Sequence, residues 1–259
     1  MDLVYIVKVG DKNEDLRYSL RSVAKFVPHD KIWIVGYKPK WVTNVNYLPV
    51  SQSGNKWQNS VNNILAACNC KDISDDFVLM NDDFFAIKSI DDLKESINVC
   101  LGLLDTTIAS YNGKKANSPW KKGFFYVDSL LKQLKIEGPY YNYESHTPLL
   151  INKTNYLTVM KLKLVQDFMK TNKVLHKRSL YRNIDKINSK TLLTDVKINT
   201  DRDVSNKSKI CDWLSVFDNQ VGNISYSNLN SLLYNLFPDR CEYEIEKKKI
   251  KKKKDMFSF

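Results

Sequence analysis

Two adjacent carboxylates, Asp82 and Asp83, follow Asn81 directly after the apolar stretch 77–80. Neighbouring like charges repel each other, so such a pair needs a stabilising partner. Mg²⁺ and Mn²⁺ are suitable partners, because both prefer oxygen ligands and are often held by one or two carboxylates plus substrate phosphates. A metal bridging a pyrophosphate would stabilise a departing nucleoside diphosphate. We therefore predict a Mn²⁺ or Mg²⁺ site at Asp82 and Asp83, with a simple surface turn as the alternative.

Histidine supplies the second candidate for chemistry. His146 lies in Glu-Ser-His-Thr-Pro at 144–148, just before an apolar stretch. It could serve as a metal ligand or a general base, and Glu144 could act as a base as well. Core packing or capping of a strand start is the alternative for both. We expect His29 to be exposed, and His176, within a basic stretch, to lie at the surface.

Cations and aromatic residues add weaker candidates. Arg17 and Arg21 lie one helical turn apart, and Lys56 follows a polar loop. Arginine side chains suit phosphate or carboxylate, although most such residues on a helix surface are solvated. Arg178 and Arg182 form a similar pair. Four aromatic residues could stack on a base or sugar, although core packing is the more common role: Trp57, Trp120, Phe124 and Phe125.

The first 90 residues alternate between strand and helix patterns. Short apolar stretches predict strands at 3–9, 31–36, 47–50 and 77–80, and apolar residues at helical spacing predict helices at 14–26 and 56–68. This order indicates a mostly parallel sheet with helices on both faces. Such sheets bind ligands outside the carboxyl ends of their strands. The loops at 10–13, 51–56 and 81–83 should meet at that edge.

The second half is mainly helical by the same criteria. We predict helices at 91–104, 118–134, 153–161, 174–187 and 227–237, and strands at 145–151 and 192–199. There is no internal repeat and no Gly/Ser linker. The sequence therefore predicts one α/β domain over 1–244, with a donor half at about 1–90, an acceptor half at about 91–244 and a polybasic tail at 245–259.

Composition limits the partners. The 259 residues are 43% hydrophobic and carry a net charge of +11. Seven of the positive charges are lysines within 247–254. A polybasic stretch attracts polyanions such as nucleic acid or acidic lipid, or it serves only solubility. Five scattered cysteines indicate reduced thiols. No secretory start or membrane span is predicted, so we expect a cytoplasmic protein without stable membrane insertion.

Several stretches resemble known families. Residues 13–22, 31–35, 39–41 and 77–84 are similar to the Stealth sugar-phosphate transferases of capsule synthesis. The segments 33–39, 54–60, 74–85 and 144–148 resemble more closely the phage-encoded glycosyltransferases with a GT-A-like fold, including the TET-associated glycosyltransferases that act on hydroxymethylated pyrimidines in phage DNA. The resemblance is dense over 3–88 and patchy to about 185.

The resemblance implies a GT-A-like fold and a site. Asp83, with Asp82, would hold Mn²⁺ or Mg²⁺ at the diphosphate of a nucleotide-sugar, and His146 would lie on the acceptor side. The residues expected around the nucleotide are Val9, Gly10 and Asp11 from the resemblance, and Arg17, Arg21 and Lys56 from their positions. An essential Glu of the Stealth pattern is absent from 60–64, which disfavours sugar-phosphate transfer.

The leading hypothesis is thus a metal-dependent transfer of a hexosyl or pentosyl group from a nucleotide-sugar to a hydroxyl acceptor. The favoured acceptor is a hydroxymethylated pyrimidine in DNA, because the chain is basic. Sugar or sugar-phosphate transfer to a surface polysaccharide is one alternative. A non-catalytic nucleic-acid-binding protein is another, but it leaves Asp82 and Asp83 without a purpose. If the chain is phage-encoded, it would act in the host cytoplasm.

Overall fold

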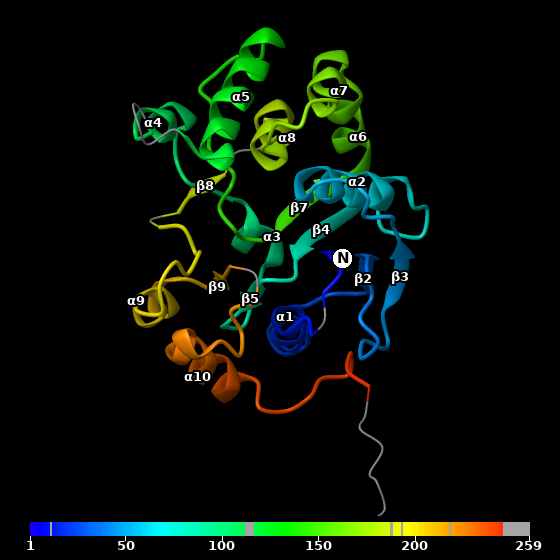
Figure 1. Ribbon diagram of the computed structural model, residues 1–259, viewed down its shortest axis with the longest axis vertical. Coiled ribbons are helices and arrows are strands. Elements are labelled where there is room, and N and C mark those ends of the chain that lie inside the picture. Colours follow the sequence, from blue (N-terminus) through cyan, green and yellow to red (C-terminus); the bar gives the residue numbers. More distant parts are fainter. Residues whose placement is uncertain (11, 112–116, 187–188, 193, 218, 246–259) are drawn as a thin grey trace, which may run out of the picture.

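A five-stranded sheet forms the centre of the protein in a computed structural model, which describes residues 1–245 except 11, 112–116, 187–188, 193 and 218. The strand order is β3–β2–β1–β4–β7 (Figure 1). Four strands are parallel, and β7 alone runs antiparallel, beside β4. The bounds are β1 Asp2–Val7, β2 Ile32–Gly36, β3 Asn46–Pro49, β4 Asp76–Asn81 and β7 Leu149–Asn152. The predicted mostly parallel α/β sheet is confirmed.

Two helices cover opposite faces of this sheet because successive side chains of β1 point to opposite sides. Leu3, Tyr5 and Val7 pack with α1 (Glu14–Phe26), whereas Val4 packs in the core that contains α2 (Lys56–Asn69). Asn55 begins α2 with a capping box, since its side chain accepts the N–H groups of Trp57 and Gln58. Both helices agree with their sequence patterns.

Helices α4 to α8 pack mainly on the α2 side of the sheet (Figure 1), whereas Leu93 and Ile97 of α3 belong to the core on the α1 side. Ser118 caps α5 by accepting the N–H of Lys121, with Pro119 at the first helical position. The bounds are α3 Leu93–Ile97, α4 Leu104–Ala109, α5 Pro119–Gln133, α6 Lys153–Lys161, α7 Lys163–Met169 and α8 Lys177–Asp185.

Strand β5 (Phe84–Ala86) leaves the central sheet and pairs antiparallel with β9 (Trp213–Ser215). Two helices, α9 (Asp203–Ile210) and α10 (Ser227–Leu236), complete a third core around this pair with the short helix η2 (Ile224–Tyr226). A further pair joins β6 (Val99–Cys100) to β8 (Lys190–Thr191). The chain after residue 190 therefore returns to the end of β4, where the acidic turn lies.

Four predicted elements in the second half are wrong or shifted. Residues 91–104 form no single helix, because α3 ends at Ile97 and the chain then pairs as β6 before Gly102 adopts a positive φ of 88°. Residues 192–199 contain no strand in the described part, only an isolated bridge between Lys197 and Ser215. The strand predicted at 145–151 begins at Leu149, and the helix predicted at 174–187 is α8.

The last described residues pack against the first part of the sheet. The N–H of Thr43 donates to the carbonyl of Tyr243 at 3.0 Å, and the N–H of Ile245 donates to the carbonyl of Trp41 at 2.9 Å. The polybasic tail lies outside the described residues, apart from Ile245. All five cysteines are free. None of the described helices is long and apolar enough to cross a membrane.

Candidate active site

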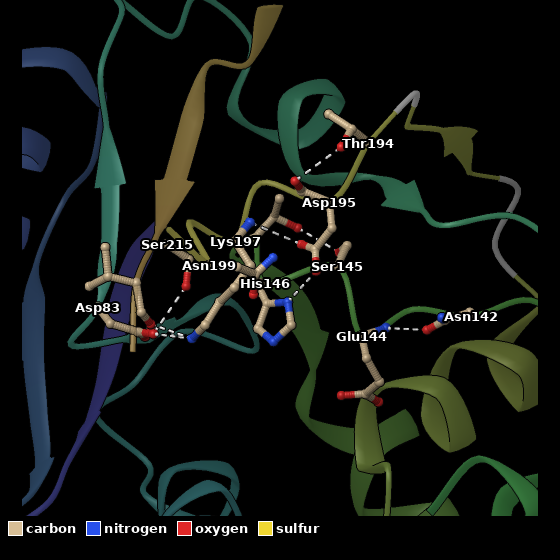
Figure 2. Close-up of polar contacts among 12 residues, drawn as sticks. Asp83, Asn142, Glu144, Ser145, His146, Thr194, Asp195, Lys197, Asn199 and Ser215 are labelled. Atoms are coloured by element: carbon tan, nitrogen blue, oxygen red, sulfur yellow. Dashed lines mark hydrogen bonds and ion pairs between the residues drawn. The ribbon is translucent and has the colours of Figure 1, made fainter. Parts of the chain in front are cut away.

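The acidic turn lies at the carboxyl end of β4, between Asn81, the last residue of that strand, and the start of β5. Asp83 is only 8% exposed. Its Oδ2 accepts hydrogen bonds from the Ser215 hydroxyl at 3.0 Å and the Lys197 ammonium at 3.3 Å (Figure 2). The carboxylate of Asp83 is thus fixed in direction, and a lysine balances its charge.

Lys197 belongs to a short segment that also supplies an acid. Its ammonium donates to the carbonyl of Val216 as well and lies 4.5 Å from the ring centre of Phe217. Its backbone N–H donates to Oδ1 of Asp195 at 3.1 Å. Asp195 therefore has one oxygen bound to its own segment and the other, Oδ2, directed at another part of the chain.

That other part is His146. Its Nδ1 lies 2.8 Å from Oδ2 of Asp195, whereas its Nε2 has no hydrogen-bond partner among the residues that the structure describes. The side chains of His146 and Asp195 are 26% and 31% exposed. A carboxylate that accepts a hydrogen bond from Nδ1–H fixes the neutral ring in the tautomer with a free lone pair on Nε2. The pair has the arrangement of a general base with its orienting acid.

The backbone of His146 adopts a left-handed φ of 52°, which is costly for a residue with a side chain. Neighbouring contacts hold it there. Arg178 of α8 donates to the carbonyl of Thr147 at 2.5 Å, and the hydroxyls of Ser145 and Thr147 lie 2.9 Å apart. The imidazole packs roughly parallel to Trp120, with ring centres 5.9 Å apart. These contacts therefore hold the turn and the imidazole of His146 in one orientation.

The acidic turn and the histidine lie in one cluster, although 60 residues of sequence separate them. In Figure 2 the Lys197 side chain runs between the carboxylate of Asp83 and the ring of His146. The polar chain Asp83–Lys197–Asp195–His146 joins them through contacts of 3.3, 3.1 and 2.8 Å. The structure thus places a group suited to holding a cation or a phosphate-linked ligand near a group suited to accepting a proton.

The donor set can be tested against a divalent cation. Within the described residues, no group of three or more His, Cys, Asp or Glu side chains converges on one point. A protein-only cage is therefore not formed there. Asp82 and Asp83 would suit Mg²⁺ or Mn²⁺ when substrate phosphates supply further oxygens, which is the common arrangement for these ions. The two carboxylates therefore fit a metal ion that is also coordinated by a diphosphate.

A pocket of about 350 Å³ opens where β1, β2 and β3 end. Val9, 66% exposed, and the rings of Tyr37 and Tyr47 line it. Gln52 closes one side, because its side chain accepts the N–H of Val9 at 3.2 Å and donates to the carbonyl of Val7 at 2.6 Å. The loop predicted to flank a nucleotide thus borders a real hollow with aromatic walls. Gly10 follows Val9, and Asp11 lies outside the described residues.

Arg17 and Arg21, which were predicted to bind the nucleotide, are paired with a carboxylate of the protein itself. Arg17 Nη1 lies 2.5 Å from Oε2 of Glu244, and Arg21 Nε lies 2.6 Å from Oε1 of the same carboxylate. Glu244 is buried, and Arg17 also lies 4.0 Å over the ring of Trp41. These arginines hold the C-terminal segment against α1, a pairing over more than 220 residues that the helix pattern could not reveal.

Lys56 lies over the first of two tryptophans that lead to the histidine. The Lys56 ammonium is 4.5 Å from the ring of Trp57, which stacks on Trp120 at 5.8 Å. Trp57, Trp120 and His146 thus form a partly exposed aromatic row from α2 across α5 to the histidine turn. Phe124 is 2% exposed and belongs to the core.

The side chain of Glu144 points away from His146 (Figure 2). Its carboxylate accepts the backbone N–H and the hydroxyl of Ser179 at 3.1 Å each. Burial raises the pKa of Glu144, but His176, Arg178 and Lys177 outweigh it and lower the pKa overall. This geometry gives no support to Glu144 as a base, because it binds the first turn of α8.

The expectation that His176 lies at the surface is wrong. It is 1% exposed, and its Nε2 is 2.8 Å from the carbonyl oxygen of Trp120. His29 is half-buried, with Nε2 2.7 Å from the hydroxyl of Tyr243. Both imidazoles are held inside the fold, whereas the partly exposed His146 has an Nε2 with no hydrogen-bond partner among the described residues.

Sequence analysis missed Asp195, Lys197 and Ser215. They lie in 192–199, expected to be an ordinary strand, and in β9, which was not predicted. Nothing in their spacing indicates that they meet Asp83 and His146, because the contacts span between 49 and 132 residues. An acid and a lysine two residues apart, with Val196 between them, were the only signal available.

No protein-family model matches the chain, and no curated protein matches it. Among solved structures, it is similar to the glycosyltransferase GlyE of Streptococcus pneumoniae TIGR4, with a TM-score of 0.48 and 11% identity. The apo form of GlyE gives a TM-score of 0.47 at the same identity. Each match covers 91% of this chain and 59% of the GlyE chain, so the protein spans about three fifths of that length.

Proposed function

We propose that this protein transfers a hexosyl or pentosyl group from a nucleotide-sugar to a hydroxyl acceptor. The observation that carries the proposal is the polar chain from Asp83 through Lys197 and Asp195 to His146. It combines groups suited to a leaving diphosphate with a base suited to a hydroxyl. Its position at the carboxyl edge of a parallel sheet is where such folds bind ligands.

His146 would act on the acceptor. Its Nε2 takes the proton of the acceptor hydroxyl while that oxygen forms a bond to the anomeric carbon of the donor sugar. The bond from that carbon to the diphosphate oxygen breaks, and the electron pair leaves with the nucleoside diphosphate. Asp195 stabilises the imidazolium that results and keeps the ring oriented. A single displacement of this kind inverts the configuration at the anomeric carbon.

The donor would extend from the pocket beside Val9 and Tyr47 to the acidic turn. The aromatic walls of that pocket suit a nucleobase. Asp82 and Asp83 would hold Mn²⁺ or Mg²⁺, which supplies Lewis-acid stabilisation of the departing diphosphate. Lys197, whose side chain is 11% exposed, adds a positive charge at the same place. Charge in a partly desolvated site acts more strongly than charge in water.

The favoured acceptor is a hydroxymethylated pyrimidine in DNA. Two features support it: the net charge of +11, which attracts a polyanion, and the aromatic row of Trp57, Trp120 and His146, which could stack on a base turned out of the helix. The hydroxyl of such a base would then reach the nitrogen that accepts its proton.

A thermal-shift screen of nucleotide-sugars with and without Mn²⁺ tests the donor. A ligand at a hundred times its Kd stabilises the native state by about 2.7 kcal/mol, which raises the melting temperature measurably. We expect one nucleotide-sugar to raise the melting temperature of wild type and of His146→Ala, but not that of Asp83→Asn. His29→Gln, a histidine away from the cluster, is the matched control. If no nucleotide-sugar shifts the melting temperature, the proposal is wrong.

Product analysis then tests the acceptor. Duplexes with hydroxymethylated or unmodified pyrimidines are incubated with the donor, and glycosylated nucleosides are measured by mass spectrometry. Transfer to the hydroxymethylated duplex alone supports DNA as the acceptor. Donor turnover with a surface polysaccharide but not with DNA favours the alternative enzyme, and DNA binding without donor binding favours a non-catalytic protein.

A further inference from the structure

Arg182 of α8 is a buried cation, and the acid one turn along the helix, Asp185, acts on it without forming an ion pair. Arg182 is 2% exposed, and it forms no ion pair with any described residue. Its Nη2 donates to Oδ1 of Asn98 and to the Ser189 hydroxyl, while its buried Nε has no partner. Burial lowers the pKa of the Arg182 guanidinium. A desolvated cation is costly unless an anion or several hydrogen bonds compensate it.

Arg21 shows how the same protein treats a comparable side chain. It is 9% exposed on α1, and Glu244 accepts from it at 2.6 and 3.1 Å, with a further bond to the carbonyl of Phe237 at 3.1 Å. Arg21 therefore has a full complement of acceptors inside the fold. Arg182 has only neutral acceptors, on one of its three nitrogens.

Arg182 lines a pocket of about 440 Å³, and Glu137 is the acidic residue among its described lining residues. Tyr141 and Tyr143 form one wall, and the Arg182 guanidinium lies 5.4 Å from the ring centre of Tyr143. Lys186, whose side chain is 59% exposed, adds a second cation, and its nearest acid is the fully solvated Glu137 at 3.8 Å. The pocket is therefore positive, with aromatic walls.

We infer that this pocket binds a small phosphomonoester, separate from the proposed nucleotide-sugar site. The planar guanidinium of Arg182 matches the oxygens of phosphate, and Lys186 can supply a second charge to a group that carries nearly two. A volume of about 440 Å³ exceeds that of inorganic phosphate and lies in the range of small-ligand pockets, so the phosphate is attached to a sugar-sized body. Tyr141 offers its ring to that body.

Isothermal titration calorimetry with ribose 5-phosphate, inorganic phosphate and ribose tests this site. We expect ribose 5-phosphate to bind more tightly than inorganic phosphate, and ribose not to bind. In Arg182→Gln, the loss of a hydrogen-bonded charge should lower the affinity for ribose 5-phosphate about ten- to a hundredfold. Arg202→Gln removes the same charge from an exposed position and should leave the affinity unchanged.

Arg182 also connects α8 to Asn98, so its replacement could prevent folding. Two milder variants keep the test decisive. Arg182→Lys keeps the charge but loses the planar guanidinium, and Lys186→Gln changes an exposed side chain. Each variant should weaken the binding of ribose 5-phosphate at least about threefold. Equal affinity in wild type and both variants overturns the proposal, and so does a wild-type protein that binds none of the phosphates. A single-stranded oligothymidylate that binds through Arg182 while ribose 5-phosphate does not would show a nucleic-acid backbone site instead, and would also overturn it.

Discussion

The Glu244 carboxylate gives the sharpest test of how the C-terminal segment is held. Its side chain is 1% exposed and lies between Arg17 at 2.5 Å and Arg21 at 2.6 Å. Glu244→Gln keeps the shape of the side chain but removes its charge, so one buried arginine loses its counter-ion.

The expected loss follows from these partners. Removing one member of a buried ion pair costs about 3–5 kcal/mol. Arg17 is 20% exposed and retains Glu14 at 3.2 Å, so most of the loss falls on Arg21. We expect Glu244→Gln to lower the free energy of unfolding by about 2–3 kcal/mol, because the glutamine still offers one acceptor. For a chain of this size, that corresponds to a fall of about 5–10 °C in the melting temperature.

Urea unfolding and thermal melting measure this loss. Glu242→Gln, an exposed change two residues away, is the control and should stay within about 0.5 kcal/mol of wild type. The double variant Arg21→Met with Glu244→Leu should recover most of the loss, since a buried pair can be replaced by apolar side chains at little cost. A Glu244→Gln protein as stable as wild type refutes this reasoning. A fully folded variant that binds nucleotide-sugars more weakly would show that Arg17 and Arg21 serve the ligand after all.

The same carboxylate predicts a pH dependence. Burial raises the pKa of Glu244, but hydrogen bonds from Arg21 and Arg17 outweigh it and hold the pKa below its usual value. A carboxyl group with a lowered folded pKa contributes stability above its unfolded pKa of about 4.3, and that stability is lost as the pH falls through the folded pKa. The difference between wild type and Glu244→Gln should therefore be full at neutral pH and shrink in acid.

Three further predictions concern the proposed chemistry. Asp83→Asn should abolish Mn²⁺-dependent shifts by nucleotide-sugars and cost about 1–3 kcal/mol of stability, since Lys197 loses its counter-charge; full activity in this variant would contradict the metal site. Asp195→Asn should lower kcat by about 10²–10⁴ without weakening donor binding, because it removes the group that orients His146. Single-turnover kinetics would measure this loss, and an unchanged rate would exclude the pair of His146 and Asp195 as the base. Truncation after Glu246 removes seven lysines and should leave donor binding unchanged, while DNA binding across a salt series should weaken with a shallower slope; superimposable salt curves would show that the tail does not bind DNA.

The periodicity of the sequence was sufficient to predict the N-terminal half. Apolar stretches separated the four parallel strands, and helical spacing placed α1 and α2 within a residue or two of their observed bounds. These elements are specified locally, because β1, β2 and β4 are apolar on both faces and each helix carries one apolar side, whereas the edge strand β3 is mostly exposed. The position of Asp82 and Asp83 at a strand end followed from the same pattern.

The second half depended on pairing between distant segments. Residues 91–104 have helical spacing, yet they divide because β6 pairs with β8, more than 80 residues away. Residues 192–199 have the sequence pattern of a strand, yet the described residues among them belong to no regular strand. In both cases tertiary contacts outweighed local preference.

The amino-acid sequence by itself thus determined the sheet, its carboxyl edge and two of the candidate groups, Asp83 and His146. Only the tertiary structure decided what those groups contact. It gave Asp83 a lysine and His146 an aspartate, and it bound Arg17 and Arg21 to Glu244 rather than leaving them for a ligand. The physical reason is that strand and helix patterns are set by neighbours along the chain. The partner of a charged side chain is instead set by whichever segment folds against it, and spacing along one sequence carries no record of that choice.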